Sequence, residues 1–224
     1  MELNYKIIYS NRKTIGIIVE RDRSVVVRAP LGSDPQKIQN LVERKKFWIF
    51  QKQNHVQKYN SVELRKEFVN GESVLYLGRN YRLQIEKSDR DDIKLVGKFI
   101  INHSSGSDIQ NVFKNWFINK AKEKITPRIK YHARNIGVKY DKILIMDMKY
   151  RWGSCTPNNN LCINWRLIKA PMTVIDYVIV HELAHLLELN HTPKFWNIVR
   201  AQTPDYERAK QWLKEHGEIL ESEF

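Results

Sequence analysis

The chain has 224 residues, of which 42% are hydrophobic and 11% aromatic, so it can bury a core and is not globally disordered. Its formal net charge of +13 favours polyanionic partners, although a basic protein without such a partner would look the same. The N-terminus has no apolar core of signal-peptide length, and no stretch approaches the roughly 20 apolar residues that cross a bilayer. The two cysteines, Cys155 and Cys162, exclude a disulfide scaffold and favour a cytoplasmic protein with small buried thiols.

Short β-branched runs dominate the first hundred residues. They predict strands at 5–9, 14–20, 24–28, 73–77, 81–86 and 93–101. Between the two groups, Ser33 or Asp34 can cap a helix that begins at Pro35 and whose apolar positions continue to Ile49. This region is predicted to form a strand-rich α+β subdomain.

A polar run at residues 104–108 has the composition of a linker. We therefore predict an N-terminal subdomain over residues 1–105 and a second domain over residues 106–224.

The second domain alternates long helices with two short strands. The apolar periodicity predicts a helix over 109–136, strands at 142–148 and 161–167, a helix from Ala170-Pro171 to about Asn190, and helices at about 192–201 and 205–216. Pro127 should kink or split the first of these helices, because proline removes a backbone donor and clashes one turn back. Residues 114–151 hold eleven Lys or Arg against three acidic residues, so the positive charge lies beside the C-terminal segment.

The C-terminal segment contains an HExxH motif, His181-Glu182-Leu183-Ala184-His185, on a predominantly apolar predicted helix. Residues four apart on a helix differ by about 40° in direction, so both imidazoles project to one side and can bind one Zn²⁺. Glu182 is offset by about 100°, so its carboxylate reaches a zinc-bound water rather than the metal. The pattern predicts a zinc hydrolase with Glu182 as the catalytic base.

A catalytic zinc usually has a third protein ligand. We predict His191, because Asn190 can adopt the left-handed conformation that ends a helix and turn the chain back to the metal. Metzincins use the same six-residue step but need a glycine where this chain has Glu188, and a Met-turn, which is missing here. Glu207 is the rival ligand, and Asp205 and His216 are more remote candidates.

The sequence resembles the YgjP-like metallopeptidases, which are minimal zincins related to the SprT-like zinc proteases. The matching segments are Tyr150-Arg151-Trp152-Gly153-Ser154-Cys155, Leu161-Cys162-Ile163-Asn164, the HExxH segment, Asn190-His191, Phe195-Trp196, Pro204-Asp205-Tyr206 and Trp212-Leu213. The match is dense over 143–213 and continues weakly through Arg28-Ala29-Pro30 and Trp48-Ile49. The resemblance implies a zincin-like core, in which the HExxH helix packs on a small mixed sheet, and a bacterial cytoplasmic protein. It also implies zinc on His181, His185 and His191.

The residues around the predicted zinc suggest how a substrate could bind. In zincins a peptide adds itself to an exposed strand edge, and residues 161–167 are our candidate for that strand. Arg151 could hold a carboxylate or phosphate or simply tie down its turn, and Trp152 is either a core aromatic or a substrate platform. Asn164 and Tyr206 complete the predicted substrate-binding residues. Tyr206 and Arg151 are also the candidates for stabilising an oxyanion.

Asp176 precedes the first histidine by five residues. It could orient a ligand imidazole or pair with the basic segment, and the sequence leaves both open.

Three functions fit these residues. The first is a zinc peptidase, in which Glu182 activates zinc-bound water to attack a peptide bond. The second keeps the metal but cleaves a nucleoside triphosphate, as in the UTP pyrophosphatase activity attributed to YgjP-like proteins; the basic segment and Arg151 motivate it. The third is a basic nucleic-acid-binding module with a structural zinc, which leaves Glu182 without a purpose. A membrane partner is not expected.

Overall fold

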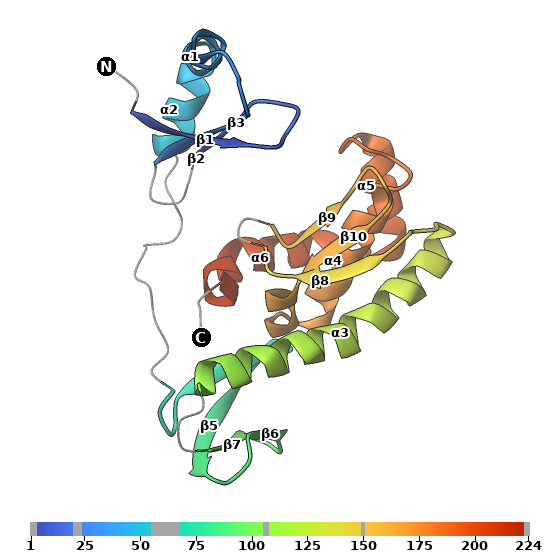
Figure 1. Cartoon of the computed structure of the whole chain (residues 1–224). Helices are drawn as coiled ribbons and strands as arrows, with labels where there is room; N and C mark the ends of the chain where they lie inside the picture. The colour runs from blue at the N-terminus through green and yellow to red at the C-terminus, as the bar shows by residue number, and fades with distance from the viewer. Residues whose placement is uncertain (1–3, 20–23, 55–67, 105–107, 149–150, 222–224) are drawn as a thin grey trace. The chain divides into compact units, whose positions relative to one another are not determined.

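The computed structural model describes residues 4–19, 24–54, 68–104, 108–148 and 151–221. The chain forms two compact units, Met1–Val62 and Glu63–Phe224 (Figure 1). The domain boundary predicted between residues 105 and 106 thus falls inside the second unit. Of the predicted linker, residues 105–107 lie outside the described residues.

The first unit is a three-stranded sheet with two helices. Its elements are β1 (Tyr5–Ser10), β2 (Gly16–Val19), β3 (Val25–Pro30), α1 (Pro35–Arg44) and α2 (Lys46–Asn54). The sheet order is β1-β3-β2, with β1 parallel and β2 antiparallel to β3. Val27 of the central strand packs with Ile38, Val42 and Ile49 from the helices. The predicted helix is therefore divided in two at Lys45, with its apolar face on the sheet.

The start of α1 follows the predicted capping rule. The Asp34 carboxylate accepts a hydrogen bond from the backbone N–H of Gln36 at 2.9 Å, and Pro35 occupies the first helical turn. The bond gives a partner to one of the N–H groups that the helix start leaves unpaired. Proline lacks an N–H, but none is needed at this position, because an N–H in the first turn would have no partner within the helix. Asp34, rather than Ser33, is thus the cap.

A four-stranded sheet opens the second unit. It contains β4 (Ser73–Tyr76), β5 (Arg79–Lys87), β6 (Asp92–Leu95) and β7 (Phe99–His103), in the order β4-β5-β7-β6. Phe99 of β7 contacts Phe113 edge to face, with ring centroids 5.2 Å apart, and also packs on Phe117. Phe113 and Phe117 both lie on α3 (Ile109–Ile136). The sheet therefore shares one hydrophobic core with α3, which explains why the chain does not divide near residue 105.

Pro127 was predicted to kink or split α3, and the helix continues through it, so the proline does not split the helix. Pro127 is exposed, and so is Glu123 one turn earlier. The carbonyl that loses its donor therefore faces solvent and can be hydrated, which lowers the penalty for proline inside a helix. Asp108 caps the helix by accepting from the N–H of Asn111 at 3.2 Å.

The remaining elements build the C-terminal part of this unit. They are β8 (Ile143–Met146), β9 (Gly153–Cys155), β10 (Leu161–Asn164), the 3-10 helix η1 (Trp165–Lys169), α4 (Met172–Ala184), α5 (Pro193–Gln202) and α6 (Tyr206–Glu221). Their sheet has the order β8-β10-β9, with β10 parallel to β8 and antiparallel to β9. The fold is thus mixed α+β, as predicted.

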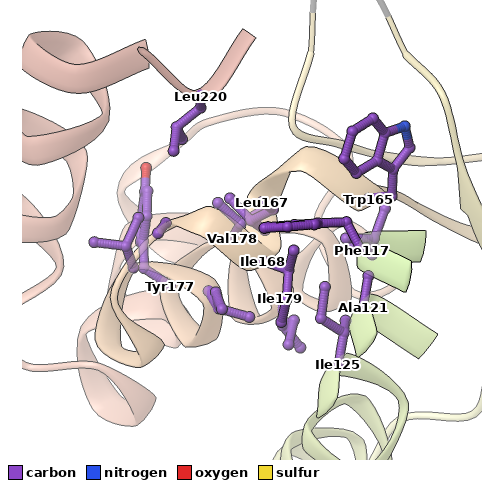
Figure 2. Close-up of a cluster of buried hydrophobic side chains, with 14 of the residues drawn as sticks. Phe117, Ala121, Ile125, Trp165, Leu167, Ile168, Tyr177, Val178, Ile179 and Leu220 are labelled. Atoms are coloured by element: carbon purple, nitrogen blue, oxygen red, sulfur yellow. The ribbon is translucent and has the colours of Figure 1, made fainter. Parts of the chain in front are cut away.

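Helices α3, α4 and α6 and the 3-10 helix η1 meet in one apolar core (Figure 2). Phe117 and Ile125 from α3, Leu167 from η1 and Ile179 from α4 are all essentially buried, and Leu220 closes the cluster from α6. The core holds α4 on several sides and so fixes the position of the HExxH segment. Among the described residues, no helix is both long and apolar enough to cross a membrane.

Candidate metal centre and active site

Helix α4 carries the HExxH segment and ends earlier than predicted. It runs from Met172 to Ala184, with His185 as its C-cap, and not to about Asn190. The backbone N–H groups of Leu187 and Glu188 both bond to the carbonyl of Ala184 and close the last turn. His181 and His185 thus lie on the final turn of the helix, where their shared direction follows from helical geometry.

A short loop brings His191 back toward α4. Asn190 does not adopt the predicted left-handed conformation: its φ is negative, unlike that of Asn159, which is positive. The N–H of Thr192 instead bonds to the carbonyl of Asn190 at 2.7 Å, and the Thr192 hydroxyl caps α5. The early end of α4 and the tight turn before α5 place His191 opposite the two helix histidines.

The three imidazoles form a cluster that can hold a metal ion. Their candidate ligand atoms all lie within 4.8 Å of one another, and the Nε2 atoms of His181 and His191 are 3.1 Å apart. Two nitrogens bound to a tetrahedral zinc at 2.0–2.1 Å would be about 3.3 Å apart, so the spacing fits such an ion. Nδ1 of His185 faces the carbonyl of Glu188 at 3.2 Å, which leaves Nε2 for the cluster.

The other candidate ligands are engaged elsewhere. Glu207 accepts a hydrogen bond from the Tyr206 hydroxyl at 3.2 Å, and His216 contacts the Trp212 carbonyl at 3.0 Å. Within the described ranges, the three histidines are the only group of His, Cys, Asp or Glu that converges in this way. The cluster does not include Glu207, Asp205 or His216.

Aromatic side chains of α5 hold the imidazoles in place. Phe195 is fully buried, and its ring centroid lies 4.7–4.9 Å from those of His181, His185 and His191. Trp196 stacks on His191 at 5.7 Å. In the sequence, Phe195-Trp196 belongs to the segments that carry the family resemblance, but no role was predicted for the pair. The available signal was their position four and five residues after His191, at the start of a helix.

Two of the histidines favour their neutral forms. Burial, followed by the proximity of His185 and His191, lowers the pKa of His181 to about 4. Partial burial, followed by the proximity of His185 and Lys210, also lowers the pKa of His191. Neutral imidazoles offer free lone pairs, so these two side chains need not release a proton before binding a metal at neutral pH.

Glu182 lies beside the cluster with little access to solvent. Its exposed fraction is 7%, and burial raises the pKa of its carboxyl to about 7, against the opposing effects of the Cys155 backbone N–H and of Arg151. A general base works best when its pKa is near the working pH. Glu182 therefore has the position and the proton affinity of a base.

Strand β9, rather than residues 161–167, forms the sheet edge at Glu182. β10 is the central strand, all four of its residues are buried, and the chain turns into η1 after Asn164. β9 packs against α4 so closely that a Cβ on Gly153 would lie 2.5 Å from Cγ of Glu182. The prediction of β10 as the exposed edge is therefore wrong, because it is paired on both sides.

The pairing of β9 leaves some of its backbone groups free. The Asn164 N–H bonds to the Trp152 carbonyl, and the Thr156 N–H bonds to the Asn160 carbonyl. Both are therefore hydrogen-bonded pairs, the class that alternates with non-hydrogen-bonded pairs along antiparallel strands. Because the classes alternate along an antiparallel pair, Gly153 and Cys155 direct their N–H and C=O groups away from β10. The Cys155 N–H lies close enough to the Glu182 carboxylate to lower its pKa.

The predicted substrate-binding residues lie in different environments. Arg151 is exposed, 3.4 Å from the Ser154 hydroxyl, and close enough to Glu182 to lower its pKa. Trp152 is half-buried against the hydrophobic core. Tyr206 is buried and stacks on Tyr177 and Trp196 at 6.3 and 5.3 Å. Of these three predicted residues, Arg151 therefore presents an exposed polar group near Glu182. Tyr150 lies outside the described residues.

Asn164 does not have the surface that a substrate contact needs. It is fully buried, and its amide donates to the carbonyls of Met148 and Arg151 at 2.7 and 3.2 Å. Its oxygen accepts from the N–H of Arg166 at the start of η1. Asn164 thus ties the turn before β9 to the end of β10, because every polar atom of its side chain is directed at backbone.

Asp176 contacts the basic segment and not a ligand imidazole. Its carboxylate accepts two hydrogen bonds from Arg128, at 2.7 and 2.6 Å, and lies 3.2 Å from Nε2 of His132. Burial disfavours its ionisation, but the bonds from His132 and Arg128 outweigh burial and lower the pKa of Asp176. This ion pair fastens α4 to α3.

The known proteins and family to which this chain is similar are metallopeptidases. No curated protein matches the sequence. Among solved structures, the metallopeptidase zymogen abylysin of Pyrococcus abyssi is 19% identical, with a TM-score of 0.39, over 45% of this chain and 98% of the other. The zymogen jannalysin of Methanocaldococcus jannaschii is 23% identical, with a TM-score of 0.35, over 40% and 97%. The model of the YgjP-like metallopeptidase domain matches residues 13–216, and the chain therefore belongs to the YgjP-like metallopeptidase family.

Proposed function

We propose that the protein is a zinc-dependent peptidase, with zinc bound by His181, His185 and His191 and with Glu182 as the general base. The observation that carries the proposal is the convergence of three imidazoles next to a buried carboxyl whose pKa is about 7. Neutral nitrogen ligands suit zinc, and three protein ligands leave one position open. Bound zinc would supply Lewis-acid polarisation of the carbonyl and lower the pKa of water.

The protein side chains would divide the remaining work. Glu182 would take a proton from the attacking water and pass it to the leaving amine, which general acid–base catalysis requires. Arg151 is exposed nearby and is the candidate for holding a developing negative charge or a substrate carboxylate. Tyr206 is a weaker candidate because it is buried and its hydroxyl donates to Glu207.

An extended peptide would bind along the free edge of β9. Gly153 directs its N–H and C=O away from β10, and backbone bonds to a strand edge bind a chain without regard to its side chains. This mode of binding fits exposed, unfolded segments of proteins as substrates. The expectation of a bacterial cytoplasmic protein still rests on the resemblance and the two cysteines.

The alternatives receive less support. Three of the basic side chains that motivated a triphosphate site are paired with carboxylates, Arg128 with Asp176, Lys120 with Glu123 and Lys114 with Asp147, although Arg151 is exposed. A nucleic-acid module with a structural zinc provides no reason to bury a carboxyl beside the metal ligands. We therefore favour peptide hydrolysis over both.

The decisive experiment uses the metal-stripped full chain with one equivalent of zinc and unfolded casein as substrate. We expect cleavage that requires zinc and that Glu182→Gln abolishes. Glu188→Gln, which makes the same charge change next to the cluster, should remain active. Cleavage that survives Glu182→Gln, or pyrophosphate release from nucleotides without any peptide cleavage, would contradict the proposal.

A further inference from the structure

Strand β9 lies close against α4 at Gly153. A Cβ added there would lie 2.5 Å from Cγ, 2.7 Å from Oε1 and 2.8 Å from Cδ of Glu182, all below the 3.0 Å that real Cβ atoms respect. The three nearest atoms all belong to one side chain. A methyl group at residue 153 would therefore displace the Glu182 carboxylate or the strand.

The backbone of Gly153 does not need glycine. Its φ is not in the positive range where side chains are strained, unlike that of Gly78 or Gly137. It lies in an ordinary antiparallel strand, opposite Ile163. Alanine can adopt this conformation, so the requirement for glycine arises from the space that Glu182 occupies.

Two neighbouring contacts show that β9 is held in this position. Asn164 clamps the turn before the strand through the carbonyls of Met148 and Arg151. At the other end, the Cys155 N–H lies close enough to the Glu182 carboxylate to lower its pKa. The glutamate is thus confined between the strand backbone and its own helix, with little room to change rotamer.

We propose that Gly153 is a positioning residue for the general base. The missing side chain lets β9 lie against Glu182, so that the strand backbone confines the carboxylate to the position in which it can act on the attacking water. The inference rests on the proposed function of Glu182. It also makes a claim about packing that holds whether or not the chain cleaves peptides.

The first arm of the test measures activity and metal content of Gly153→Ala. We expect one equivalent of zinc to remain bound, kcat to fall by about 100-fold and KM to change much less, because displacement of a catalytic group by about 1 Å has an effect of that size. Gly16→Ala is the matched control. Gly16 is also a strand glycine with ordinary φ, and its Cβ would meet only the flexible end of Arg12, at 3.1 Å.

The second arm is a stability cycle on the metal-free chain. Gly153→Ala should lower the midpoint of urea unfolding in the wild-type background, but much less in a Glu182→Ala background, where the clashing atoms are gone. Wild-type kcat in Gly153→Ala, or the same destabilisation in both backgrounds, would overturn the inference. If the wild type cleaves no peptide, the proposed function fails, and the stability cycle alone decides the role of Gly153.

Discussion

Helix α4 carries two carboxyl groups six residues apart, the partly buried Asp176 and the buried Glu182, and their environments shift the two pKa values in opposite directions. Asp176 is met by Arg128 and His132 from α3, and its pKa falls. Among the described residues no cation forms an ion pair with Glu182, and burial raises its pKa to about 7 against the smaller effects of the Cys155 N–H and Arg151. Burial alone therefore does not determine the role of a carboxyl, since the partners decide whether it acts as a brace or as a base.

The largest expected effect separates the two carboxyls by activity. Glu182→Gln should lower kcat for casein cleavage by about 10²–10⁴-fold with zinc content unchanged, because it removes the general base. Asp176→Asn should lower kcat far less, since Asp176 contacts no ligand histidine in the described structure. If kcat at saturating substrate fell equally in both variants, the two carboxyl groups would not differ in function as proposed.

The metal ligands come next. His191→Ala should weaken zinc binding by more than the roughly 10–100-fold that loss of a supporting hydrogen bond costs, because it removes a whole ligand. His216→Ala and Glu207→Ala should bind zinc like the wild type, since neither residue joins the cluster. Competition with a chromophoric chelator measures all three, and strong loss in Glu207→Ala would restore that residue as the ligand.

The change that lowers activity at Glu182 should raise the stability of the metal-free protein. A carboxyl with an ordinary pKa of 4.5 that titrates near 7 in the fold destabilises it progressively from pH 4.5 to 7. Glu182→Gln should therefore stabilise the metal-free chain by about 2–3 kcal/mol at pH 8, and by little at pH 4. Urea unfolding at the two pH values measures this, and an unchanged stability at pH 8 would show that the buried carboxylate is compensated.

The smallest expected effect concerns the ion pair between Asp176 and Arg128. Asp176→Asn should destabilise the fold by about 1–2 kcal/mol at pH 7, a value discounted because a third of Arg128 is exposed and screened by solvent. Since the pKa of Asp176 is lowered from 3.8, its contribution is present above that pH and disappears as the pH falls further. Unfolding midpoints of the two proteins should therefore converge in acid, and a constant difference would point to lost packing instead.

Much of the candidate site was predictable because it depends on local geometry. The four-residue spacing of His181 and His185 places both rings on one side of any helix, and the apolar periodicity of residues 109–136 predicted α3. The cap at Asp34 likewise needs only its own helix start. His191 was an inference from spacing, and the structure brings it to the other two histidines by a different turn than expected.

Features that depend on distant pairing were not predictable in the same way. Strand 161–167 looks like an edge in sequence, but β8 and β9 pair with both sides of it, and Asn164 serves the turn before β9. Pro127 is tolerated because tertiary packing leaves it on the exposed side of α3. Residue types at helical spacing were enough to predict a metal site. The strand edge, the raised pKa of Glu182 and its close contact with Gly153 follow from the tertiary structure, because each depends on which backbone lies against α4.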